Sequence, residues 1–165
     1  MAASIPADAL VLLVGAAASG KSTWAAARFR PTQIVSSDTF RELVADDAAD
    51  QGATRVAFQL LHLVAGARLE RGLLTVIDAT NLTSRARRPL LALAERYGRP
   101  AVAVVFDVPL DVLRERNAAR GRTVGEDVLF RHVQQLRASL GQLPTEGYVG
   151  LIDGADPAPI VVTDR

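Results

Sequence analysis

Short apolar runs alternate along this chain with longer segments of mixed polarity. A short run that is apolar almost throughout is typical of a strand covered on both faces, as in the parallel sheets of α/β proteins. The runs are Leu10–Val14, Gln33–Ser36, Leu73–Asp78, Pro100–Phe106 and Tyr148–Ile152. They predict a central parallel sheet of about five strands.

The segments between these runs have apolar residues three and four positions apart, which is the period of an amphipathic helix. Predicted helices cover 39–45, Ser84–Tyr97, Pro109–Ala119 and a segment that opens at Thr123. A longer helix has the apolar stripe Val56, Leu60, Leu61, Val64 and Ala67. Alternating strands and helices predict an α/β fold with right-handed crossovers and helices on both faces of the sheet. Pro89 should start, bend or locally break its helix.

The segment Gly15–Ser22 matches the P-loop pattern G-x-x-x-x-G-K-[S/T] and lies between a predicted strand and a predicted helix. In a P-loop, backbone N–H groups surround the phosphates of a nucleotide, and the lysine ammonium reaches the β and γ oxygens. Lys21 is the only lysine among nineteen basic residues, and we expect it on an exposed loop. Ala17 and Ala18 stand where many P-loops have glycine, although alanine adopts positive φ less easily. The predicted phosphate-binding residues are Gly15, Ala18, Ser19, Gly20, Lys21, Ser22 and Thr23.

Composition and charge limit the possible functions. Hydrophobic residues make up 49% of the 165 residues and charged residues 22%, which predicts one globular domain over 1–165. The absence of cysteine excludes disulfides and thiolate metal sites and favours a cytoplasmic location. No apolar run approaches the roughly 20 residues of a membrane helix. The net charge of +1 argues against a broad duplex-binding surface but allows contact with one nucleic-acid end.

Asp38 and Arg41 follow the second predicted strand, one helical turn apart. Ligands collect at the carboxyl ends of the strands in a parallel sheet, so both side chains are candidates for the site. Aspartate is also a favoured N-cap, and Asp–Arg pairs at this spacing are common on helices. From these residues alone, a capping role for Asp38 is the simpler interpretation.

Asp78 closes the third predicted strand, where P-loop proteins place the carboxylate that holds the water shell of magnesium. Mg²⁺ takes a few protein oxygens together with waters and substrate phosphates. The hydroxyl of Ser22 and a water-bridged Asp78 would be sufficient. The alternative is a carboxylate that caps the following turn.

Arg116 and Arg120 lie four residues apart near the end of the predicted helix Pro109–Ala119, with Arg122 just beyond it. Projecting from one face, two such guanidinium groups would make a fork for phosphate oxygens. We therefore predict a lid over about 107–125 that covers the γ-phosphate. Arg114 is expected to pair with Asp111 on the outside.

Other polar residues have structural interpretations. Thr123 and Glu126 have the spacing of a capping box that opens the last helix. His132 lies on the apolar stripe of that helix, so we interpret it as a hydrogen-bonded histidine in the core or near the site rather than a base. Arg85, Arg87 and Arg88 form a basic cluster that we expect to be solvated.

These motifs together resemble the kinase domain of bacterial polynucleotide kinase-phosphatase, an RNA-repair enzyme. The motifs are the P-loop, Ser36-Ser37-Asp38-x-x-Arg41, Asp46-Asp47-x-x-Asp50-Gln51, Asp78-Ala79-Thr80-Asn81 and Arg116-x-x-x-Arg120. The resemblance implies a P-loop kinase fold and transfer of the γ-phosphoryl of ATP, with Mg²⁺, to the 5′-OH end of RNA or DNA. It implies Asp38 as general base, Arg41 as a binder of acceptor phosphate, and Arg116 and Arg120 as lid arginines. Family members continue into phosphatase and ligase-like domains, which are possible partners of this chain.

Two other functions remain open at this stage. A small-molecule kinase of the gluconate or antibiotic type would share the P-loop, lid and aspartate base. A non-catalytic ATP-binding switch would need neither base nor lid. Arg41 beside Asp38 favours an anionic acceptor over a sugar.

Overall fold

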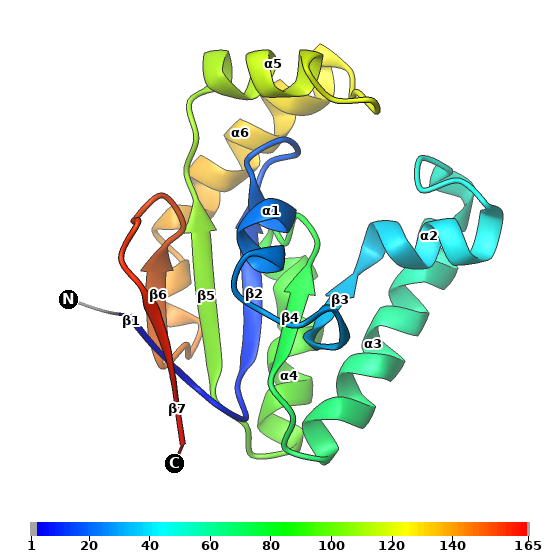
Figure 1. Ribbon diagram of the computed structural model, residues 1–165. Helices are drawn as coiled ribbons and strands as arrows, with labels where there is room; N and C mark the ends of the chain where they lie inside the picture. Colours follow the sequence, from blue (N-terminus) through cyan, green and yellow to red (C-terminus); the bar gives the residue numbers. More distant parts are fainter. Residues whose placement is uncertain (1–2, 165) are drawn as a thin grey trace.

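The computed structural model describes residues 3–164, and its centre is a five-stranded parallel sheet (Figure 1). The strand order is β3-β4-β2-β5-β6. Their bounds are β2 Leu10–Gly15, β3 Ile34–Ser36, β4 Thr75–Asp78, β5 Ala101–Phe106 and β6 Gly150–Asp153. The predicted sheet of about five strands is confirmed, with boundaries that shift by one or two residues.

Helices connect these strands and cover both faces of the sheet (Figure 1). Their bounds are α1 Lys21–Ala26, α2 Ser37–Ala45, α3 Thr54–Glu70, α4 Ser84–Arg96, α5 Leu110–Ala118 and α6 Glu126–Leu140, with short 3₁₀ turns at Pro31–Gln33, Gln51–Ala53 and Leu143–Thr145. Two further strands that the sequence pattern did not predict, β1 Ala3–Pro6 and β7 Ile160–Thr163, pair in parallel with each other. Between residues 3 and 164, no helix combines the length and apolarity needed to cross a bilayer.

Strand β2 divides the core between the two faces of the sheet. All six of its residues are buried. Leu10, Leu12 and Val14 pack in the cluster that includes residues of α3, α4 and α6. Val11 and Leu13 point the other way and pack with Trp24 of α1 and with Ile5. This alternation confirms that the apolar run reflects a strand covered on both faces.

The strand register brings three connections together at the carboxyl edge of the sheet. Gly15 at the end of β2 pairs with Phe106 of β5, and Ser36 of β3 pairs with Asp78 of β4. The P-loop, the start of α2 and the end of β4 therefore meet at one edge, above which α5 lies (Figure 1).

The buried face of α3 differs from the predicted stripe. The residues that contact the core most fully are Ala57, Leu61, Ala65, Gly66 and Leu69. Ala67 is exposed, and the larger apolar residues of the predicted stripe other than Leu61 are only half-buried. Small residues allow close approach: a Cβ on Gly66 would lie 3.4 Å from a methyl group of Leu93 on α4.

Pro89 neither starts nor breaks its helix. It lies inside α4, which is continuous from Ser84 to Arg96. Proline has no backbone N–H, so the carbonyl one turn earlier lacks its usual helical donor. Pro89 is exposed, so water can donate a hydrogen bond to that carbonyl instead.

The expectation of a solvated arginine cluster is wrong for Arg87, which is completely buried. Its Nε and Nη2 donate to the two carboxylate oxygens of Glu146 at 2.7 and 2.6 Å, and Nη1 donates to the carbonyl of Asn81 at 2.8 Å. The hydrogen bonds from Arg87 hold the pKa of Glu146 below its ordinary value. This bidentate pair ties α4 to the segment before β6. Arg85 and Arg88 are exposed, as expected.

We predict that Arg87→Met lowers the free energy of unfolding by about 3–5 kcal/mol, because Glu146 would remain buried without its cation. The matched control is Arg88→Met, the exposed neighbour, which should change stability by no more than about 0.5 kcal/mol. Urea unfolding of the two variants measures the difference. Equal stability of both would mean that Glu146 gains an equivalent partner elsewhere.

Candidate functional site

A cavity of about 840 Å³ lies at the carboxyl edge of the sheet. Its walls are the P-loop, the first turns of α2, the end of β4, the segment after α5 and one face of α6. The lining includes these predicted site residues: Ala18, Ser19, Gly20, Lys21, Ser22, Thr23, Asp38, Arg41, Asp78, Arg116 and Arg120. Gly15 lies beneath the loop instead, where a Cβ would stand 2.9 Å from both Phe106 and the Ser19 hydroxyl.

The P-loop is bent by two residues with positive φ, Gly20 at 96° and Ala18 at 63°. Glycine adopts such a backbone without penalty, whereas alanine loses roughly 1–2 kcal/mol. The concern that the sequence raised over alanine in this loop therefore applies to Ala18. The surrounding structure has to hold that residue in place.

Lys21 is buried rather than exposed, in contrast to the expectation from sequence. Its Nζ donates to the carbonyls of Gly15 at 3.0 Å and Ala16 at 2.6 Å. Burial lowers the pKa of Lys21 to about 8, an effect that nearby Asp78 opposes and nearby Arg120 reinforces. An ammonium with so little water around it is poised to bind an anion that enters the cavity.

Ser22 and Asp78 form a direct pair, in which the serine hydroxyl donates to Oδ2 of Asp78 at 2.7 Å. Burial raises the pKa of Asp78, while the bond from Ser22 and the charge of Lys21 lower it. Over residues 3–164 no three His, Cys, Asp or Glu side chains converge as a metal-ligand cluster. A hydroxyl and one carboxylate beside a phosphate-binding loop fit Mg²⁺, which keeps several waters and takes phosphate oxygens as further ligands.

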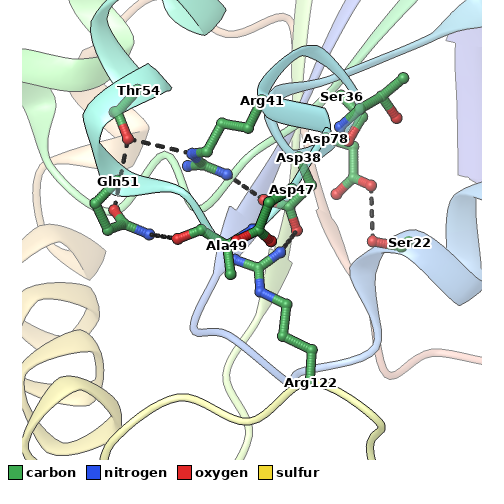
Figure 2. A network of polar contacts seen from close by, with 11 residues as sticks. Ser22, Ser36, Asp38, Arg41, Asp47, Ala49, Gln51, Thr54, Asp78 and Arg122 are labelled. Carbon is green, nitrogen blue, oxygen red and sulfur yellow. Dashed lines mark hydrogen bonds and ion pairs between the residues drawn. The ribbon is translucent and has the colours of Figure 1, made fainter. Parts of the chain in front are cut away.

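Asp38 is not the N-cap of α2, since the helix begins at Ser37 and Ser36 accepts the capping bond from Thr39 N at 3.4 Å. The side chain of Asp38 is instead half exposed in the cavity, where it is ion-paired with Arg41 (Figure 2). Arg41 is buried, and its Nε also donates to the hydroxyl of Thr54 at 3.2 Å. The capping explanation for Asp38 is therefore removed, whereas the Asp–Arg pair expected at this helix spacing is present.

The two arginines for which the sequence predicted a lid reach the cavity from different elements. Arg116 lies on α5, and its Nη1 donates to the carbonyl of Ser19 at 3.1 Å. Arg120 lies beyond the helix, which ends at Ala118, so the prediction of two arginines on one helical face is wrong. Both side chains nevertheless line the cavity.

Two predicted local pairings around the lid are replaced by one contact. Arg114 binds Glu126 rather than Asp111. Glu126 is consequently unavailable for a capping box with Thr123, and α6 begins after Gly125 without a side-chain cap. Arg114 and Glu126 lie 12 positions apart on different helices, so spacing rules within one helix could not indicate their contact.

Sequence reasoning missed one contact in this site. Arg122, in the segment after α5, donates from Nη1 to Oδ2 of Asp38 at 3.1 Å (Figure 2). The two residues are 84 positions apart. Only the position of Arg122 just after the lid helix hinted at its proximity to the site.

His132 anchors the P-loop from α6, because Nδ1 accepts the backbone N–H of Ala17 at 3.2 Å. Burial, reinforced by the charges of Lys21 and Arg131, lowers the pKa of His132 to about 4. The ring is therefore neutral near pH 7, with its proton on Nε2. The prediction of a hydrogen-bonded histidine near the site is confirmed by this contact.

The depressed pKa of His132 predicts a loss of stability in acid. Between about pH 6.5 and pH 4 the unfolded histidine binds a proton that the folded one does not, so the free energy of unfolding falls as pH falls through this window. The contribution is at most about 3 kcal/mol and is reduced by partial exposure. His132→Asn, which keeps an acceptor but does not titrate, should show a smaller fall in urea unfolding across the same window. Identical pH dependence of the two proteins would contradict the role assigned to His132.

Comparison with known proteins relates this chain to a protein family and to solved structures. The sequence matches the AAA domain family over residues 10–143. A chain in the structure of the Pnkp1/Rnl/Hen1 RNA repair complex is 25% identical with a TM-score of 0.72, and the match covers 84% of this chain and 47% of that one. This chain thus spans about half the length of that relative. Among curated protein sequences no match was found.

Small-molecule kinases share the fold at lower identity. A gluconokinase from Sinorhizobium meliloti 1021 is 18% identical with a TM-score of 0.55, covering 93% of this chain and 86% of that one. A shikimate kinase from Acinetobacter baumannii, in complex with shikimate, is 16% identical with a TM-score of 0.52, covering 90% and 85%. The chain therefore belongs to the AAA domain family and has the fold of the P-loop kinases.

Proposed function

We propose that this chain is an ATP-dependent 5′-hydroxyl polynucleotide kinase, which transfers the γ-phosphoryl of ATP to the 5′-OH end of RNA or DNA in nucleic-acid repair. The observation that carries the proposal is the ion pair of Asp38 with Arg41 in the same cavity as the P-loop. The pair places a carboxylate that can act as a base directly beside a guanidinium that can bind an anion. The 25% identity to a chain of an RNA repair complex supports the same assignment.

A P-loop kinase fold implies that a nucleotide binds at the P-loop. In the proposed complex, loop N–H groups and Lys21 hold the ATP phosphates, while Arg116 and Arg120 contact them from the segment 107–125, which acts as a lid. Ser22 and Asp78 would hold Mg²⁺, which supplies charge neutralisation on the phosphates when bound. To bind ATP, Lys21 exchanges the carbonyls of Gly15 and Ala16 for phosphate oxygens.

The acceptor enters on the side of Asp38. Its 5′-oxygen bonds to the γ-phosphorus as the bond to the β–γ bridging oxygen breaks, and ADP leaves. Asp38 orients the hydroxyl and takes its proton, while Arg41 contacts the phosphate of the acceptor strand. The buried position of Arg41 and its bond to Thr54 fix the guanidinium for this contact.

A small-molecule kinase is the second candidate. It is favoured by the gluconokinase and the shikimate kinase, which share the fold over most of both chains. Sequence identities of 18% and 16% support a shared fold but not a shared substrate. A non-catalytic switch is less well supported, because it assigns no role to the Asp38 carboxylate that lines the cavity.

Partners and location belong to the same proposal. The related chain comes from a complex whose name includes Rnl and Hen1, and this chain spans only 47% of it. Phosphatase and ligase-like domains are therefore proposed as partners. The lack of cysteine supports a cytoplasmic location.

The function is tested by transfer of labelled γ-phosphate to a 5′-OH oligonucleotide, with gluconate, shikimate and a nucleoside as rival acceptors. Asp38→Ala should lower kcat by about 10²–10⁴-fold, the range for a positioned general base, while ATP binding is retained. Glu42→Ala, an exposed carboxylate on the same helix, is the matched control and should keep its activity. Transfer to gluconate or shikimate instead of the oligonucleotide would establish the second candidate.

ATP binding should be coupled to proton uptake at Lys21. With its pKa at about 8, much of Lys21 is neutral at pH 8.5 in the free protein, and phosphate oxygens would raise that pKa. We expect uptake of about half a proton or more per ATP at pH 8.5, measured by calorimetry in two buffers of different ionisation enthalpy. Lys21→Arg stays charged, so its uptake should be near zero. Equal uptake by both proteins would assign the proton to another group.

A further inference from the structure

The carboxylate of Asp38 is held between two guanidinium groups from different parts of the chain (Figure 2). Arg41 of α2 binds Oδ1, and Arg122 binds Oδ2 at 3.1 Å. All three side chains line the same cavity. An anion that entered beside Asp38 would therefore meet two cations together with the one carboxylate that they share.

The two arginines differ in how firmly they are held. The Arg41 side chain is 11% exposed and has a second bond, to Thr54. The Arg122 side chain is 34% exposed, and that of Asp38 is 50% exposed. Ion pairs with this much exposure contribute only about 0–1 kcal/mol, so the contact between Arg122 and Asp38 is easily exchanged.

The backbone around Arg122 is nevertheless well fixed. Asn117 of α5 donates from Nδ2 to the carbonyl of Val124 at 2.9 Å and accepts the N–H of Val124 at 3.0 Å. This pair of bonds closes the segment that contains Arg120 and Arg122 back onto the helix. Arg122 is thus presented from a loop that is closed onto α5, and its side chain extends toward Asp38 (Figure 2).

Arg122 also lies apart from the arginine contacts on the donor side. Arg116 is bonded to the P-loop at Ser19, and Arg120 acts electrostatically on Lys21. Arg122 instead binds Asp38, the residue placed on the acceptor side. When an acceptor hydroxyl and its neighbouring phosphate approach Asp38, the guanidinium that exchanges most readily is that of Arg122, because it is the one held less firmly.

We propose that Arg122 is a second acceptor-binding residue, which exchanges Asp38 for the phosphate that follows the attacked 5′ hydroxyl. Arg41 and Arg122 then bind this phosphate from two sides, α2 and the lid. The inference rests on the proposed function and deepens it. It adds an acceptor-binding residue on the lid to the one on α2, and it makes lid position depend on the acceptor phosphate.

The test compares kcat/KM for thymidine 3′-phosphate and thymidine, and for the matching pair of uridine acceptors. The wild type should prefer the phosphorylated acceptors by about 10-fold or more, the value of a charge-assisted hydrogen bond. Arg122→Gln should reduce that ratio by about 10-fold, through a higher KM for the phosphorylated acceptor, with KM for ATP unchanged. Arg122→Lys, which keeps the charge but not the planar donors, should fall between the two.

Arg114→Gln is the matched control, because Arg114 lies on the same lid and binds Glu126 outside the cavity. It should keep the wild-type ratio. The inference would be overturned if Arg122→Gln kept the wild-type ratio of kcat/KM between phosphorylated and unphosphorylated acceptors. It would also be overturned if Arg122→Gln and Arg122→Lys lowered kcat/KM equally for both acceptors. Either result would assign Arg122 to the lid or donor side. If the wild type phosphorylates no nucleotide or oligonucleotide, the proposed function fails instead, so the two failures are distinguishable.

Discussion

The parallel pairing of β2 with β4 on one side and β5 on the other is the constraint on which the rest of the molecule depends. Because these strands and β3, which pairs with β4, run parallel, they all end at the same edge of the sheet, and every connection leaves from that edge. The P-loop, the first turn of α2 and Asp78 meet for that reason, although they are far apart in sequence. Because β2 is buried on both faces, its register is fixed by packing, and the loop that follows it begins from a rigid base.

That rigid base carries a site in which some of the charged residues are buried. Lys21 and Asp78 are both removed from water, and each moderates the effect of burial on the other. Such an arrangement is unfavourable in isolation and is typical of functional sites rather than of stabilising networks. By contrast, Arg87 and Glu146 form a bidentate pair away from the cavity, and the carbonyl of Asn81 accepts a further bond from Arg87. The chain thus uses one buried ion pair to fix its architecture and keeps the charges of the other region ready for a ligand.

Much of this could be predicted from sequence where the signal is local. The continuous apolar run at Leu10–Val14 correctly predicted the central strand. The P-loop after it correctly predicted where the cavity lies. Predictions that relied on spacing along one helix were less reliable, because long-range contacts compete with them. Glu126 pairs with Arg114 instead of capping α6, and small residues turn α3 so that Ala67 faces solvent. The burial of Arg87 could not be predicted at all, since its partner Glu146 is 59 residues away.

Ala18 has a consequence for the stability of the loop that contains it. Its backbone is left-handed, at φ 63°, and the bond from Ala17 to His132 secures the neighbouring peptide. Alanine also has fewer accessible conformations than glycine in the unfolded chain. Part of the conformational entropy that a glycine would lose here on folding is therefore already absent from the unfolded chain. Ala18 thus strains the folded loop and restricts the unfolded chain, two opposing contributions to the stability of the P-loop.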